Sequence, residues 1–186
     1  MWWNALLTAF GLTFVAELGD KTQIIILTLA ARHGFKQVFL GAAAAFALLN
    51  ALAVSVGVLL YRVLPEEVIK YSVSAIFILF GILSLLPERE KDEAEETKER
   101  RGPILSSFLL IGLMDLGDKT QLSLVALTAK YSQPFFVFIG GTLALWLASL
   151  IAALVGAGVS KIISQRWLRR ISGIIFIAFG VIYLFF

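Results

Sequence analysis

The sequence contains no cysteine and only one histidine, His33, among its 186 residues. Without cysteine the protein can form neither a disulfide bond nor a thiolate metal site. Charged residues make up only 16% of the chain, and its one long polar stretch is too short to fold as a separate domain. These absences exclude a water-soluble catalytic domain and an extended nucleic-acid surface, so the function is expected to lie between apolar segments.

Apolar residues, in contrast, make up 59% of the chain. A helix needs about 20 mostly apolar residues to cross the hydrocarbon layer of a bilayer. Because such runs follow one another along almost the whole chain, we predict an all-α membrane protein with six transmembrane helices. The predicted spans are residues 5–31, 37–61, 68–87, 103–129, 134–160 and 168–186.

A charged segment divides the chain into two nearly equal parts. Twelve of the fourteen residues from Glu88 to Arg101 are charged, with both signs mixed, which is typical of a solvent-exposed linker. We therefore predict two units, residues 1–87 and 103–186, joined by a linker at 88–102. The loops on the side of this linker hold eleven Lys and Arg residues against three on the opposite side. The positive-inside rule then places the linker in the cytoplasm and both termini outside it.

The two parts repeat one another. The sequence is ELGDKTQ at residues 17–23 and DLGDKTQ at residues 115–121, so six of seven positions are identical at an offset of 98. At an offset of 99, further matches are Val38–Gly41 with Val137–Gly140, Gly57 with Gly156, and Phe80–Gly81 with Phe179–Gly180. Because each repeat has an odd number of spans, the second repeat enters the membrane from the side opposite to the first. The sequence therefore predicts two inverted three-helix repeats, an arrangement that places the substrate near the bilayer midplane.

The motifs place four carboxylates inside the predicted membrane spans. They belong to Glu17, Asp20, Asp115 and Asp118. Each such group costs roughly 2.5 to 3.5 kcal/mol at the centre of a span. Only two ammonium groups, of Lys21 and Lys119, oppose them, which leaves a formal charge of minus two (four minus two). One divalent cation or two protons can neutralise this charge, so the motifs predict an exchanger.

The spacing within each motif suggests two kinds of contact. On a continuous helix, side chains three positions apart lie on one face, which gives two sets of oxygen ligands. The predicted ligands are Glu17, Asp20 and Gln23 in the first motif and Asp115, Asp118 and Gln121 in the second. Hard cations such as calcium, manganese and magnesium prefer oxygen ligands. The alternative is purely structural, with ion pairs four residues apart, Glu17 with Lys21 and Asp115 with Lys119.

Other residues are predicted to support this site. Gly19 and Gly117 would allow the helix to loosen or a neighbour to approach, and the remaining supporting positions lie next to them in the motif. These are Lys21, Thr22, Lys119 and Thr120. Outside the motifs, Asn50 matches Ser149 at the offset of 99. Either side chain could line the substrate path or form a hydrogen bond between helices.

Two copies of a Glu-x-Gly-Asp-Lys-Thr type motif, one in each three-span half, resemble the family of the Golgi manganese and calcium transporter and its bacterial manganese-exporter relatives. The resemblance covers nearly the whole chain. It implies antiport of manganese or calcium against protons, with the acidic positions of both motifs in the ion site. Asp115 departs from the family pattern, which usually has glutamate there, and its shorter side chain changes the reach of that ligand.

From this resemblance we expect a transporter in a prokaryotic cytoplasmic membrane that exports the metal with proton influx as the driving force. No permanently bound cofactor is expected, only the transported cation and protons. The sequence leaves open whether manganese or calcium is preferred and whether the protein forms a homo-oligomer.

Three other functions have requirements that differ from those of an exchanger. A six-span exporter of amino acids or other small metabolites would have a similar size, but it would not need four buried acids. A passive cation channel would use acidic rings, yet the lysine in each motif would obstruct cation flow. A membrane-embedded enzyme would need a nucleophile with a base, or a histidine-containing metal motif, and the sequence has neither.

Overall fold

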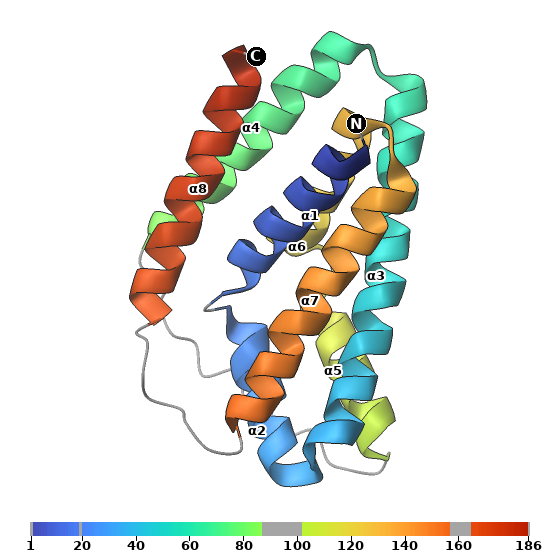
Figure 1. Cartoon of the computed structure of the whole chain (residues 1–186), viewed down its shortest axis with the longest axis vertical. Coiled ribbons are helices and arrows are strands. Elements are labelled where there is room, and N and C mark those ends of the chain that lie inside the picture. Colours follow the sequence, from blue (N-terminus) through green and yellow to red (C-terminus); the bar gives the residue numbers. More distant parts are fainter. Residues whose placement is uncertain (1, 19, 87–101, 157–164, 186) are drawn as a thin grey trace.

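The computed structural model describes residues 2–18, 20–86, 102–156 and 165–185, and in these residues the chain forms eight α-helices. Their bounds are α1 Trp2–Glu17, α2 Lys21–His33, α3 Phe35–Val63, α4 Glu66–Leu85, α5 Pro103–Asp115, α6 Lys119–Tyr131, α7 Pro134–Gly156 and α8 Gln165–Phe185. Both ends of the chain lie at the same end of the bundle (Figure 1). The predicted linker, apart from Gly102, lies outside the described residues.

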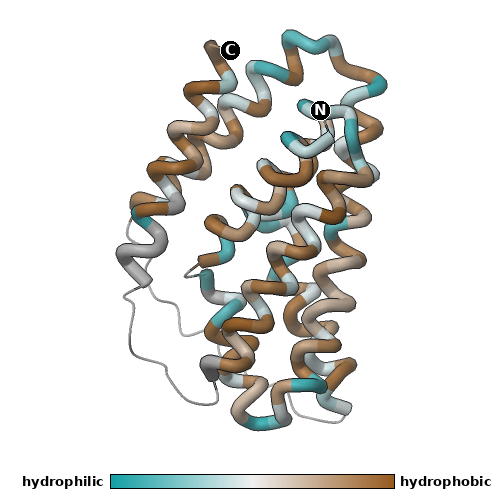
Figure 2. The backbone as a smooth tube through the Cα atoms, in the orientation of Figure 1, coloured by the Kyte–Doolittle hydropathy of each residue, from teal (hydrophilic) through white to brown (hydrophobic). Residues whose placement is uncertain are grey.

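The helices carry their apolar side chains outward as well as inward. Helices α3, α4 and α7 are each long and apolar enough to cross a membrane, and α5 and the second part of α8 are shorter apolar helices. Many large apolar side chains are exposed on the outside of the bundle, among them Leu52, Leu59, Leu143, Leu154, Ile174 and Ile182. Brown, which marks hydrophobic residues, accordingly runs along most of the helices in Figure 2. Such a surface is stable in lipid rather than in water, so the protein is an integral membrane protein.

The first and fourth predicted spans are not continuous helices. Each consists of two shorter helices that meet inside the acidic motif, α1 with α2 at residues 18–20 and α5 with α6 at residues 116–118. The prediction that the three ligands of each motif lie on one face of a continuous helix is therefore wrong, because the helix ends between the first acidic residue and the second.

Local backbone chemistry explains the breaks. Gly117 has a φ of +83°, a conformation that glycine adopts without steric cost. The Asp118 amide donates to the carbonyl of Asp115 at 3.1 Å, and the Asp20 amide donates to the carbonyl of Glu17 at 3.1 Å. The second break is therefore a single tight turn, and at the first break the corresponding bond joins Asp20 to Glu17. An aspartate then occupies the position immediately before the next helix, Asp20 before α2 and Asp118 before α6.

The helices before and after residues 87–101 are interleaved. Helices α1 and α2 pack on α7, whereas α5 and α6 pack on α3, so each broken pair lies along a continuous helix from the other half of the chain. Helices α3 and α7 pack on each other and run in opposite directions (Figure 1). Helix α4 packs on α8, where the rings of Phe77 and Phe176 lie 5.7 Å apart.

Glycine allows the closest of these approaches. A Cβ atom at Gly41 would collide with the backbone carbonyl of Ile104, and one at Gly140 with that of Leu6. In the α4–α8 pair, Gly81 lies against the carbonyl of Gly173, and Gly180 lies against that of Ser74. The obstructing atoms are backbone, so the neighbouring helix would have to move to admit a side chain.

We predict that Gly41→Ala lowers the stability of the protein by about 1 to 3 kcal/mol, because the added methyl group overpacks the contact between α3 and α5. Gly11→Ala is the matched control. No atom lies within 4 Å of a Cβ at Gly11, so alanine there is expected to leave stability unchanged or raise it by up to about 1 kcal/mol. Thermal unfolding in detergent measures both variants. Equal melting temperatures would contradict the close contact.

Candidate cation site

The two acidic motifs, 98 positions apart in the sequence, are in contact in the structure. The ammonium group of Lys119 donates to Oδ1 of Asp20 at 2.7 Å, and the hydroxyl of Thr22 donates to Oδ1 of Asp115 at 2.8 Å. Each bond joins one motif to the other. The interleaved packing is responsible, because α1 also lies against α6, and α2 against α5.

The four acidic residues occupy corresponding places at the helix ends. Glu17 and Asp115 are the last residues of α1 and α5, and Asp20 and Asp118 immediately precede α2 and α6. Neither aspartate caps its own helix with its side chain. The Glu17 carboxylate lies close enough to the other three acids and to Lys119 for their charges to act on it. The breaks therefore gather the charged groups of both motifs in one region of the bundle.

Two of these carboxylates are deeply buried. The exposed fraction is 1% for Glu17 and 3% for Asp115. Thr22 satisfies one oxygen of Asp115, whereas neither oxygen of Glu17 has a hydrogen-bond partner in the described part of the chain. A buried carboxylate without hydrogen bonds is costly when it is ionised. Glu17 therefore needs a proton or a cation that its described neighbours do not supply through a hydrogen bond.

The ion pair that the structure forms differs from the one suggested by the sequence. Lys119 binds Asp20 in the other motif, so the suggested local pair of Asp115 with Lys119 is wrong. The side chain of Lys21 and the whole of Gly19 lie outside the described residues, and the pair of Glu17 with Lys21 stays a prediction.

The remaining motif residues have distinct places. Thr22 and Thr120 are both buried, but only Thr22 reaches a carboxylate, and the hydroxyl of Thr120 has no hydrogen-bond partner in the described part of the chain. The side-chain oxygen of Gln121 accepts a hydrogen bond from the amide of Gly117 at 3.0 Å, so in this structure it stabilises the second break. Gln23 is partly buried. The predicted ligand roles of both glutamines remain predictions.

Carboxylates alone do not form a complete metal shell in this arrangement. Among the residues that the structure describes, no three acidic or histidine side chains are grouped as a metal site. A divalent cation would therefore have to take the place of Lys119 at Asp20, or recruit neutral oxygen atoms, or both. Such oxygens are available from carbonyl groups at the ends of broken helices, as in other membrane transporters.

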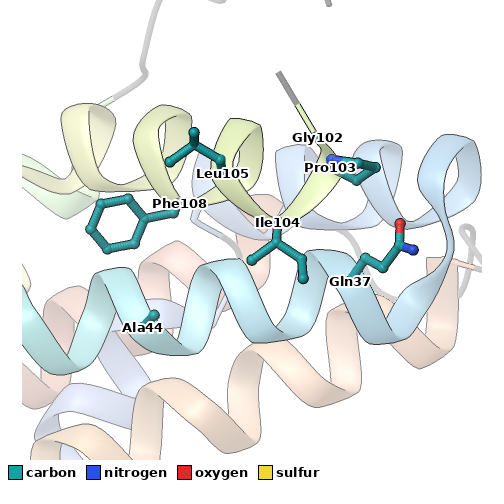
Figure 3. Close-up of a pocket in the computed structure, with 7 residues that line it drawn as sticks. All are labelled: Gln37, Ala44, Gly102, Pro103, Ile104, Leu105 and Phe108. Carbon is teal, nitrogen blue, oxygen red and sulfur yellow. The ribbon is translucent and has the colours of Figure 1, made fainter. Parts of the chain in front are cut away.

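A groove of about 360 Å³ lies elsewhere, between the N-terminal parts of α3 and α5 (Figure 3). Its lining is mostly apolar and includes Gln37, Pro103, Ile104 and Phe108. None of the motif residues contributes to it, so this groove is separate from the candidate site.

The chain matches the family described as "Divalent cation/proton antiporter GDT1" over residues 5–92 and 103–186, which together include both motifs. The chain belongs to this family. The expected resemblance is thereby confirmed, and as a member of the GDT1 family the protein is a divalent cation/proton antiporter and not an enzyme.

Several relatives in the GDT1 family match most of the chain. A Vibrio cholerae protein named "Putative manganese exporter" is 31% identical over 175 residues, covering 92% of this chain and 86% of that protein. A GDT1-like protein of Synechocystis is 30% identical, covering 95% of this chain and 97% of the relative. GDT1-like protein 3 of Arabidopsis thaliana is 26% identical, with coverage of 96% and 69%. No solved structure matches this chain.

Proposed function

We propose that this protein exports manganese or calcium ions from the cytoplasm in exchange for protons, through one site that the two acidic motifs form together. The observation that carries the proposal is the pair of bonds across the motifs, Lys119 to Asp20 and Thr22 to Asp115. Because each motif holds a carboxylate of the other, neither motif can bind or release a cation independently.

The proposal includes two inverted repeats, α1–α4 and α5–α8, and equivalent contacts support it. Gly41 meets Ile104, Ser107 and Phe108, whereas the corresponding Gly140 meets Leu6, Ala9 and Phe10. The first set of partners becomes the second when 98 is subtracted from each number. In addition, α1 and α5 run in opposite directions in Figure 1, as do α3 and α7 and as do α4 and α8. A pseudo-two-fold axis of this kind would pass through the region of the two breaks.

Charge sets the coupling in this mechanism. With both motif lysines protonated, the four carboxylates leave a charge of minus two, which one divalent cation or two protons neutralise. Metal and protons then compete for the same oxygens, so one leaves as the other binds. Lys119 holds Asp20 in the structure and would be displaced when the cation arrives.

The direction of transport and the class of cation follow from the ligands and the membrane. Carboxylate and amide oxygens suit calcium and manganese, and the Vibrio cholerae relative bears a name that describes manganese export. We place the protein in a bacterial cytoplasmic membrane with both termini outside the cytoplasm. The inward proton gradient of such membranes then drives the metal outward.

Proteoliposomes that contain a pH-sensitive dye test the proposal. Manganese or calcium added outside is expected to enter while protons leave, so the interior becomes alkaline, with two protons moved for each metal ion. Magnesium, which sheds its water reluctantly, is expected to give a smaller response. Protein-free liposomes are the control. Absence of proton movement with every cation would refute the exchanger, and a ratio other than two would refute the charge account.

A further inference from the structure

Asn50 is a buried polar residue outside the motifs, and its side chain is only half satisfied. It lies in the middle of α3 with an exposed fraction of 1%. Its Nδ2 atom donates to the hydroxyl of Thr142 on α7 at 3.1 Å. Its Oδ1 atom is buried and has no hydrogen-bond partner in the described part of the chain. An amide oxygen left in this state inside a membrane protein is costly unless something else binds it.

The contacts along α3 place Asn50 level with the break between α5 and α6. Ala45 lies against Gly112 in α5, and Gly57 lies against Val125 and Thr128 in α6. Helices that pack side by side advance by about 1.5 Å per residue. Asn50 is five residues beyond Ala45 and seven before Gly57. Counting the same number of residues along α5 and α6 from these two contacts places Asn50 at the level of residues around 117–120. These residues include Asp118 and Lys119 of the second motif.

The chemistry of the site calls for an oxygen of this type. Calcium takes about six to eight oxygen ligands, and neutral amide oxygens are common among them. The acidic side chains alone do not form such a shell in the structure, and a fifth carboxylate would raise the negative charge of the empty site. An amide oxygen adds a ligand without adding charge. The bond from Nδ2 to the Thr142 hydroxyl fixes the amide group of Asn50. The Oδ1 atom of Asn50 is therefore directed away from that hydroxyl.

We propose that Asn50 supplies a neutral oxygen ligand to the transported divalent cation, with Thr142 as the residue that positions it. This inference rests on the proposed function and adds a residue that neither motif contains. The competing interpretation is that the Asn50–Thr142 bond only joins α3 to α7.

Manganese binding to the full-length protein in detergent, measured by the loss of the electron paramagnetic resonance signal of free Mn²⁺, separates the two interpretations. Asn50→Ala is expected to weaken binding by roughly 10- to 100-fold or more, because loss of a ligand should cost at least as much as loss of a residue that only supports one. Asn50→Asp is expected to bind manganese several-fold more tightly, because the ligand is kept and gains a charge.

The controls make each outcome decisive. Thr142→Val should weaken binding several-fold, whereas Thr128→Val, an equally buried threonine whose hydroxyl donates within its own helix, should not change it. If Asn50→Asp binds no more tightly than Asn50→Ala, Asn50 is a structural residue and the inference is wrong. Asp20→Asn is measured in parallel. If it abolishes binding while the Asn50 variants do not affect it, only this inference fails, and if no variant affects binding, the proposed function fails as well.

Discussion

Replacing both Asp20 and Asp118 with asparagine is expected to reduce metal-driven proton movement to the level of protein-free liposomes. The change keeps the shape of each side chain and removes two negative charges. Glu17 and Asp115 then face Lys21 and Lys119, and the formal charge of the site falls from minus two to zero. A neutral site in a low-dielectric interior has no reason to bind a divalent cation or to take up protons in its absence.

The matched control for this double variant is Glu66→Gln with Glu67→Gln. These two acids are exposed at the start of α4 and belong to neither motif. Transport by the control should equal that of the unchanged protein. Substantial proton movement by the Asp20 and Asp118 variant, in protein that is correctly inserted, would show that these carboxylates do not carry the exchange.

The second large effect is expected at Lys119. In Lys119→Met, Asp20 loses the cation that holds it at 2.7 Å. Removing one partner of a buried ion pair typically costs about 3 to 5 kcal/mol. The side chains of Lys119 and Asp20 retain exposed fractions of 20% and 13%, so a loss near the lower end of this range is expected. Thermal unfolding in detergent without added divalent cation measures the loss.

Two comparisons identify the cause of that loss. The double variant Lys119→Met with Asp20→Asn should recover most of the stability, because no uncompensated charge remains. Manganese should also raise the melting temperature of Lys119→Met more than that of the unchanged protein, since the metal can take the empty place beside Asp20. Lys36→Met, at an exposed lysine near the start of α3, controls for the loss of a positive charge elsewhere. Equal losses in the single and double variants would attribute the effect to packing.

The sequence predicted where the apolar helices lie, and missed how two of them are interrupted. The predicted spans 37–61 and 68–87 agree with α3 and α4 within a few residues, because continuous apolar runs bounded by polar turns define such helices well. The breaks inside 5–31 and 103–129 were not predicted as ends of helices. Hydropathy averages over about 20 residues, so a turn of three residues leaves only a weak trace in it.

The sequence predicts the residue types of the candidate site but not how they pair. The repeated motif and the excess of acids over lysines single out four carboxylates, whose role as ion ligands stays a prediction. The bond from Lys119 to Asp20 could not be read from the spacing within one motif, because it depends on how the two breaks face each other. Asn50 gave only a faint signal, a polar residue inside an otherwise apolar run.

The glycine contacts of α3 have a mechanical consequence for the bundle. Gly41 holds the outer part of α5 at backbone distance, and Gly57 does the same for α6. Between these two pinned points the α5–α6 chain has one turn of non-helical backbone, at residues 116–118. A helix that is held near its outer end bends most easily where it is interrupted, so the flexibility of the α5–α6 segment is expected to be concentrated at residues 116–118. The bundle can therefore tighten or relax at this turn while its outer ends keep their spacing.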